Sequence, residues 1–224
     1  MKRSIAVGEG IGILRINRSY YFIFIILNID YHIILASNSP RRKELLAGLG
    51  LEFEVRTLPG IDESYPSELK QGEIPLHIAK EKADAYRSQL GDNDLLITAD
   101  TIVWLRGEVL GKPADRDEAI QMLKKLSGCT HQVYTGVALT TKAWQRSFYV
   151  ETHVHFAALN DEDILYYVDT YKPYDKAGAY GVQEWIGYVG VEGLEGSYYN
   201  VMGLPVQRLY RELRKIQSST STKS

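Results

Sequence analysis

The segment Ile33-Ile34-Leu35-Ala36-Ser37-Asn38-Ser39-Pro40-Arg41-Arg42 decides the fold expected for this chain. An apolar run leads into a short polar turn, and an amphipathic segment from Lys43 to Leu49 follows, which is the order of strand, turn and helix. Ser39 suits an N-cap, Pro40 suits the first helical position and Gly50 suits a helix end. The free N–H groups of the first helical turn, beside two guanidinium groups, favour an anion such as phosphate.

Composition suits a globular protein, and the use of cysteine fits a reducing compartment. Its 224 residues carry a formal net charge of −2 and are 45% apolar, which suits one large domain or two small lobes with a substantial core. The near-neutral charge argues against general binding to nucleic acid. The single cysteine, Cys129, excludes an intrachain disulfide framework, and a small residue near a loop is favoured over a reactive thiol.

Residues 1–30 leave three interpretations open. Basic residues precede the apolar run Tyr20 to Leu27, as in a targeting signal. That run is too short to span a bilayer as a helix, and no small-residue cleavage pattern follows it. We favour an N-terminal extension, disordered or added by a start codon placed too early, over an additional strand or a targeting segment. One domain is then expected over residues 31–216, and a frayed tail over residues 217–224.

The remaining pattern predicts an α/β protein with a mixed, twisted sheet, flanking helices and two lobes around a central cleft. Strands are expected at 32–36, 51–56, 95–98, 132–141, 146–156 and 185–191, with a hairpin over 102–110. Helices are expected at 40–49, 75–90, 116–127 and 161–169, with a last helix from Ser197 to about Ile216. For the second helix, the inward face is expected to carry Ile74, Ile78, Ala79, Lys82, Ala85 and Tyr86.

Asp100 is the sharpest catalytic candidate among the polar residues at the junctions of these elements. It follows an apolar strand, at the place where open α/β sheets bind their ligands. A carboxylate there can accept a proton from water, hold a metal ion or do both, whereas the alternative is an aspartate that caps a turn.

Other polar residues are weaker candidates when each is taken alone. Glu63 is a candidate metal ligand, and Lys82 and Lys112 are candidate phosphate partners, although exposed side chains are the commoner outcome. Asp175-Lys176 is equally a catalytic pair or a salt bridge in a turn. His153 and His155 share a strand face with no third ligand at metal spacing, which favours ordinary strand histidines. The sequence contains neither a P-loop nor a Gly-x-Ser-x-Gly elbow.

An ordered series of motifs resembles the Maf family of nucleotide pyrophosphatases from about Ile33 to about Leu213. The motifs are SNSPRRKELL (37–46), EKA (81–83), ITADTIV (97–103), LGKP (110–113), HQVYTGV (131–137), DKAGAYGVQ (175–183) and GSYYNVMGLP (196–205). Each is weak alone, and the ordered set is specific. DKAGAYGVQ resembles the branch that hydrolyses dTTP and UTP to the monophosphate and pyrophosphate.

The resemblance also implies roles for individual residues. Asp100 is implied as the catalytic proton acceptor and, with Glu63, as a ligand of a divalent cation, Mg²⁺ or Mn²⁺. The residues implied to choose the nucleotide are Arg41, Thr101 and Gln183, and those implied to bind phosphate are Ser39, Arg42, Lys82 and Lys112. The family is cytoplasmic and has an ITPase-like fold with a mixed sheet between two lobes.

The expected partner is a nucleoside triphosphate, with no nucleic acid and no membrane, and a homodimer remains open. Two other functions also remain open. One is a broader housekeeping hydrolase of modified nucleotides, and the other is a nucleotide-binding regulator of cell division.

Overall fold

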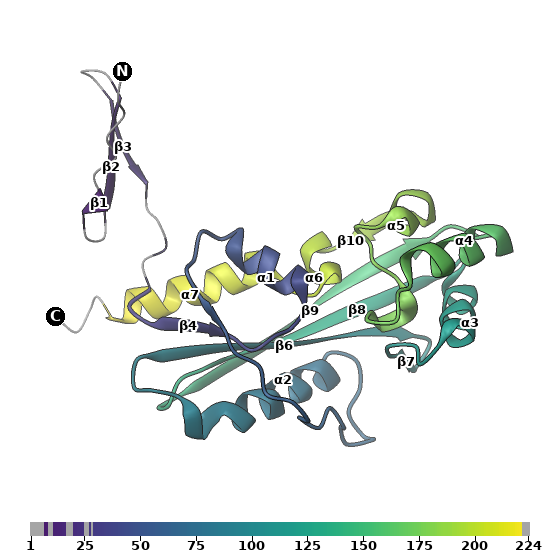
Figure 1. Cartoon of the computed structure of the whole chain (residues 1–224), viewed down its shortest axis with the longest axis horizontal. Coiled ribbons are helices and arrows are strands. Elements are labelled where there is room, and N and C mark those ends of the chain that lie inside the picture. The colour runs from purple at the N-terminus through teal and green to yellow at the C-terminus, as the bar shows by residue number, and fades with distance from the viewer. Residues whose placement is uncertain (1–6, 9–10, 17–19, 25–26, 28, 221–224) are drawn as a thin grey trace.

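The computed structural model describes residues 7–8, 11–16, 20–24, 27 and 29–220 (Figure 1). A seven-stranded sheet has the order β10-β9-β8-β6-β4-β5, with β7 paired to β6. Its strands are β4 (His32–Leu35), β5 (Glu54–Val55), β6 (Asp94–Leu105), β7 (Glu108–Leu110), β8 (Thr130–Thr140), β9 (Gln145–Phe156) and β10 (Val191–Glu195). β4 runs parallel to β5 and β6, and the other pairs are antiparallel, so the predicted mixed α/β sheet is confirmed.

Helices cover both faces of this sheet. They are α1 (Pro40–Ala47), α2 (Glu73–Tyr86), α3 (Arg116–Leu126), α4 (Asp161–Tyr171), α5 (Trp185–Gly190), α6 (Tyr198–Met202) and α7 (Val206–Thr220), with 3-10 turns η2 (Arg87–Gln89) and η3 (Ala177–Ala179). Figure 1 shows α1 and α7 on one face and α2 on the other, while α3, α4 and α5 gather at one end.

Strand alternation explains why two cores form on opposite faces of the central strands. Leu35 of β4 and Ile97 of β6 pack in the cluster that contains Leu209 and Leu213 of α7. Their neighbours Ile34 and Leu96 pack with Ala79, Ala83 and Tyr86 of α2 on the other face. Because both faces are covered, the central strands are almost continuously apolar rather than alternating.

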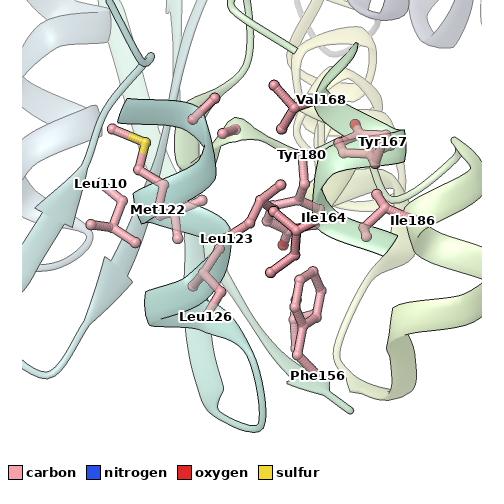
Figure 2. Packing of buried hydrophobic residues seen from close by; sticks show 14 of the residues in the cluster. Leu110, Met122, Leu123, Leu126, Phe156, Ile164, Tyr167, Val168, Tyr180 and Ile186 are labelled. Atoms are coloured by element: carbon pink, nitrogen blue, oxygen red, sulfur yellow. The ribbon is translucent and has the colours of Figure 1, made fainter. Parts of the chain in front are cut away.

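A third core fills the end of the molecule where α3 and α4 lie. Figure 2 shows Leu123 and Leu126 pointing toward Ile164, Phe156 and Tyr180. These side chains are buried, and they join the outer parts of the long strands to the helices that cover them. The long strands β6 and β8 therefore contribute residues both to this core and to the core that packs against α7.

β6 lacks a strand partner along part of one edge. β8 pairs with it from Leu96 to Trp104. On the opposite edge, β4 pairs with residues 94–97 and β7 with residues 103–105, and within the described sheet no strand pairs with residues 98–102 there. Asp100 and Thr101 lie in this unpaired stretch of β6. Their side chains lie on opposite faces of the sheet, because successive residues of a strand alternate between the two faces.

Local capping follows the sequence closely. The Ser39 hydroxyl accepts a hydrogen bond from the Arg42 backbone N–H at 3.4 Å, and Pro40 is the first helical residue. Asp115 accepts from the Glu118 N–H at 2.9 Å, and Asn160 accepts from the Asp163 N–H at 2.7 Å. Each cap satisfies an N–H group that has no partner within its helix, which explains where these helices begin.

Two predictions about the C-terminal part were wrong. Residues 185–190 form helix α5 rather than a strand, with Ile186 buried and Tyr188 and Val189 exposed, and the strand β10 follows it. A short apolar run does not by itself distinguish the two. The single helix expected from Ser197 is two helices, because Gly203 adopts φ +114° and Pro205 interrupts the backbone hydrogen bonding.

Other boundaries also shift. The expected strand over 51–56 shortens to β5, and α1 ends at Ala47 instead of near Leu49. On α2, Ala85 is exposed and Ala83 is buried, so the expected inward face was wrong at this position. α7 continues to Thr220, beyond the end expected near Ile216, and residues 221–224 lie outside the described residues.

Part of the N-terminal segment is also described. β1 (Val7–Gly8), β2 (Ile11–Ile16) and β3 (Tyr20–Phe24) form a separate three-stranded antiparallel sheet, which Figure 1 shows apart from the seven-stranded sheet. Strands thus lie where an extension, an additional strand or a targeting segment was considered, and the origin of this segment stays a prediction. Among the described helices, none combines the length and the apolar composition that a membrane span requires.

Candidate active site

A cavity of about 480 Å³ opens at the unpaired stretch of β6. The start of α1, the loop before α2, α2 itself, the loop that contains η3 and the turn after α6 complete its wall. Every residue predicted for the site lines it: Ser39, Arg41, Arg42, Glu63, Lys82, Asp100, Thr101, Lys112 and Gln183. Residues that are far apart in the sequence therefore meet in one place.

Asp100 and Glu63 converge on Lys82. The Lys82 Nζ atom lies 2.8 Å from Asp100 Oδ1 and 2.8 Å from Glu63 Oε1. The Asp100 and Lys82 side chains are each 13% exposed, whereas that of Glu63 is 49% exposed. Burial alone would raise the pKa of Glu63, but the hydrogen bond and the charge of Lys82 outweigh it, and Lys112 and Arg42 lower the pKa further.

Arg42 is held from two sides. Its Nε donates to the Gly203 carbonyl oxygen at 2.9 Å, and its Nη2 donates to Thr101 Oγ1 at 3.1 Å. Burial lowers the pKa of Arg42 and the nearby charge of Asp100 opposes that shift, although a guanidinium remains protonated in such a setting. Arg42 thus places a fixed positive charge on the cavity wall.

Arg41 belongs to a separate charge network. Its Nη1 lies 3.0 Å from Asp175 Oδ2, and Lys176 Nζ lies 2.7 Å from Asp175 Oδ1 and 3.1 Å from Glu184 Oε1. Burial would raise the pKa of Asp175, but its hydrogen bonds to Lys176 and Arg41 hold the pKa below the usual value. Asp175 and Lys176 form a salt bridge within the loop, and the salt bridge between Asp175 and Arg41 ties this loop to α1.

Gln183 and Lys112 complete the site in different ways. Gln183 Oε1 is buried, and within the described residues it has no hydrogen-bond partner, so an N–H group of a ligand would satisfy it. Lys112 is exposed at the cavity wall, where its charge acts on Glu63.

Sequence reasoning missed three contributors. The Thr135 hydroxyl contacts Thr101, the Asn200 carbonyl contacts Thr135, and the Gly203 carbonyl holds Arg42. They lie within the motifs at 131–137 and 196–205, but none has a titratable side chain. The one sequence signal for these contributors was Gly203 itself, because its φ of +114° disfavours any residue other than glycine.

The donors present suit a magnesium-type ion that arrives with phosphate. Within the described residues, no group of three or more His, Cys, Asp or Glu side chains could hold a metal ion. Mg²⁺ commonly binds through one or two carboxylates together with substrate phosphates, and Asp100 and Glu63 supply two carboxylates on the same cavity. The strand histidines have other contacts, since His153 pairs with Glu151 and His155 contacts Thr130.

Known proteins share this sequence over most of its length. The family described as Maf-like protein matches residues 32–216. A dTTP/UTP pyrophosphatase of Phocaeicola vulgatus is 67% identical over 186 residues, covering 83% of this chain and 96% of that protein. A dTTP/UTP pyrophosphatase of Bacteroides thetaiotaomicron is 63% identical over 190 residues, covering 84% and 98%. A solved HAM1 protein of Coxiella burnetii gives a TM-score of 0.45 at 15% identity, covering 83% of this chain and 99% of that chain.

Proposed function

The chain belongs to the Maf-like protein family, and from this premise we propose that it hydrolyses dTTP and UTP to the nucleoside monophosphate and pyrophosphate. It is thus a hydrolase of nucleoside triphosphates. The observation that carries the proposal is the Asp100 carboxylate, held 2.8 Å from Lys82 in a cavity that five cationic residues line.

The charge of the cavity suits a triphosphate. Arg41, Arg42, Lys82 and Lys112 line it, and the N-terminus of α1, capped by Ser39, opens onto it. Guanidinium and ammonium groups bind phosphate oxygens strongly, and the first turn of a helix favours an anion. Ser39, Arg42, Lys82 and Lys112 are the phosphate-binding residues of this proposal.

Asp100 acts on the attacking water. Its Oδ1 is held by Lys82, and its second oxygen, Oδ2, accepts the proton of the water. The water oxygen bonds to the α-phosphorus while the bond from this phosphorus to the bridging oxygen breaks, and pyrophosphate leaves. Negative charge grows on the bridging oxygen, and the fixed cations stabilise it.

A divalent cation, Mg²⁺ or Mn²⁺, is part of the proposal, with Asp100 and Glu63 as its protein ligands. When bound, it would neutralise phosphate charge and polarise the phosphoryl group. Lys82 contacts both of these carboxylates, since its Nζ atom lies 2.8 Å from one oxygen of each.

Arg41, Thr101 and Gln183 are the residues proposed to choose the nucleotide. The buried Oε1 of Gln183 calls for an N–H donor, and pyrimidine bases offer polar groups along the edge that carries N3. A site built from such hydrogen bonds rejects a base that leaves its polar groups unpaired.

The cytoplasm is the proposed location, with nucleoside triphosphates as partners and with neither nucleic acid nor a membrane. The net charge of −2 supports the expected lack of a nucleic-acid partner, because it provides no general attraction for nucleic acid. A homodimer stays a prediction, for which the oligomeric state in solution is the test.

A panel of triphosphates tests the activity. The chain is incubated with dTTP, UTP, purine triphosphates and modified nucleotides in the presence of Mg²⁺ or Mn²⁺, and the release of pyrophosphate is measured. We expect dTTP and UTP to be hydrolysed fastest. Turnover of purine triphosphates at the same rate would contradict the proposed specificity, and faster turnover of a modified base would favour the broader hydrolase.

A further inference from the structure

The hydroxyl groups of Thr101 and Thr135 face each other across two paired strands. Thr101 of β6 and Thr135 of β8 are register partners, and their Oγ1 atoms lie 2.9 Å apart. Thr135 is completely buried, and its Oγ1 lies 3.0 Å from the Asn200 carbonyl oxygen. Thr101 is partly exposed and lines the cavity.

The number of protons determines the direction of these hydrogen bonds. A threonine hydroxyl has one proton to donate and two lone pairs to accept with. The backbone carbonyl oxygen of Asn200 can only accept a hydrogen bond, so Thr135 donates its proton to that oxygen. Thr135 must then accept a hydrogen bond from Thr101. Thr101 then has no proton left, and the Arg42 guanidinium occupies one of its two lone pairs.

The opposite direction is less favourable. If Thr135 donated to Thr101, its oxygen and the Asn200 carbonyl oxygen would lie 3.0 Å apart, in a buried place, with no proton between them. Two acceptors at hydrogen-bond distance repel each other, and burial removes the water that would screen them. The Asn200 oxygen also accepts the Gly203 N–H, which holds this carbonyl in position.

We infer that Thr135 is a specificity-determining positioning residue, which locks the Thr101 hydroxyl as a hydrogen-bond acceptor toward the cavity. An acceptor there pairs with N3–H of uracil or thymine and opposes N3 of cytosine, which carries a lone pair. The inference rests on the proposed function for the identity of the ligand, since it assigns the discrimination between uracil and cytosine to a residue that does not touch the base.

Equilibrium binding of non-hydrolysable UTP and CTP analogues tests this assignment. Thr135→Val removes the hydroxyl and frees the Thr101 proton to turn toward the cavity, whereas Thr135→Ser keeps the hydroxyl and is the matched control. The wild-type chain should bind the UTP analogue more tightly. Thr135→Val should reduce the ratio of the two dissociation constants about tenfold, the effect of one hydrogen bond, and Thr135→Ser should retain it.

The outcomes separate this inference from the proposed function. An unchanged ratio of the two dissociation constants in a folded Thr135→Val chain would overturn the inference. Tighter binding of the CTP analogue than of the UTP analogue by the wild-type chain would also overturn it, and this second measurement does not depend on the folding of any variant. A parallel loss of affinity for both analogues would indicate a merely structural role and would also overturn it. Failure of the wild-type chain to release pyrophosphate from UTP would instead contradict the proposed function and leave the binding ratio readable.

Discussion

The ammonium group of Lys82 on α2 lies 2.8 Å from the carboxylate of Asp100 on β6. The same ammonium lies 2.8 Å from Glu63, in the loop before α2. One cation therefore holds two carboxylates together in a cavity that Arg41, Arg42 and Lys112 also line. This arrangement explains how acidic and basic side chains coexist in the site that is proposed to bind phosphate.

Asp100→Asn should reduce the rate of pyrophosphate release from UTP at least about a hundredfold. The amide keeps the shape of the side chain but cannot take the proton of the attacking water. Asp92→Asn is the control, because the Asp92 side chain is 92% exposed on the surface. Activity near that of the wild-type chain would remove Asp100 from the mechanism.

Expressing Asp100→Asn in cells also tests the alternative function as a nucleotide-binding regulator of cell division. A regulator that needs only to bind the nucleotide should keep its effect on cell division when Asp100 is replaced by Asn.

Lys82→Met should lower kcat/KM for UTP by about a hundredfold, the effect of losing one preorganised charged donor. The substitution removes the group that contributes most to lowering the pKa of Glu63, so that pKa should rise. Lys80→Met is the matched control, because Lys80 lies on the same helix with an exposed side chain. Equal activity of the two variants would show that the contact between Lys82 and Asp100 has no catalytic role.

His131 should make the fold sensitive to acid. Burial, with a smaller effect of His155, lowers the pKa of His131 to about 3 from the ordinary 6.5, and its Nε2 lies 2.8 Å from the Tyr180 hydroxyl. Below pH 6.5 the unfolded chain binds a proton that the folded chain does not. The free energy of unfolding should therefore fall as the pH drops from 6.5 toward 3.

Urea unfolding at several pH values measures this effect. His131→Phe should flatten the dependence of stability on pH in this range, because the substituted residue has no proton to gain. His77→Phe is the control, since His77 is partly exposed on α2. An equally steep dependence in His131→Phe would show that other groups cause the loss of stability in acid.

Gly136→Ala should destabilise the fold by about 1–3 kcal/mol or more. Gly136 is the register partner of Asp100 on β8, and a Cβ atom there would lie 2.3 Å from the backbone carbonyl of Pro75 at the start of α2. Backbone cannot move aside as a flexible side chain would. The substitution should therefore push α2, and Lys82 with it, away from the sheet.

Gly111→Ala provides the matched comparison in thermal unfolding. A Cβ atom at Gly111 would meet no atom within 4 Å. This variant should unfold at nearly the temperature of the wild-type chain. Similar unfolding temperatures for Gly111→Ala and Gly136→Ala would show that α2 does not need the close approach to β8.

Much of the fold could be predicted because the relevant signals are local. The cap predicted at Ser39 depends on a side chain and a backbone group three residues apart, and the structure shows it. The segment 185–190 was misassigned because a short apolar run fits a strand or a helix equally well. In the structure Ile186 is buried while Tyr188 and Val189 are exposed. This difference in burial distinguishes the helix from a strand, and it depends on the packing of elements that are distant in the sequence.

The sequence by itself determined the strand–turn–helix unit around Ser39, the mixed sheet and the list of charged residues that line the cavity. Hydrogen bonds between neighbours, side-chain period and chemical type carry this information along the chain. Only the tertiary structure decided that Lys82 joins Glu63 to Asp100, and that Arg42 is held by Gly203 and Thr101. Those contacts join residues far apart in the chain, and their distances and proton directions depend on how closely the strands and helices pack.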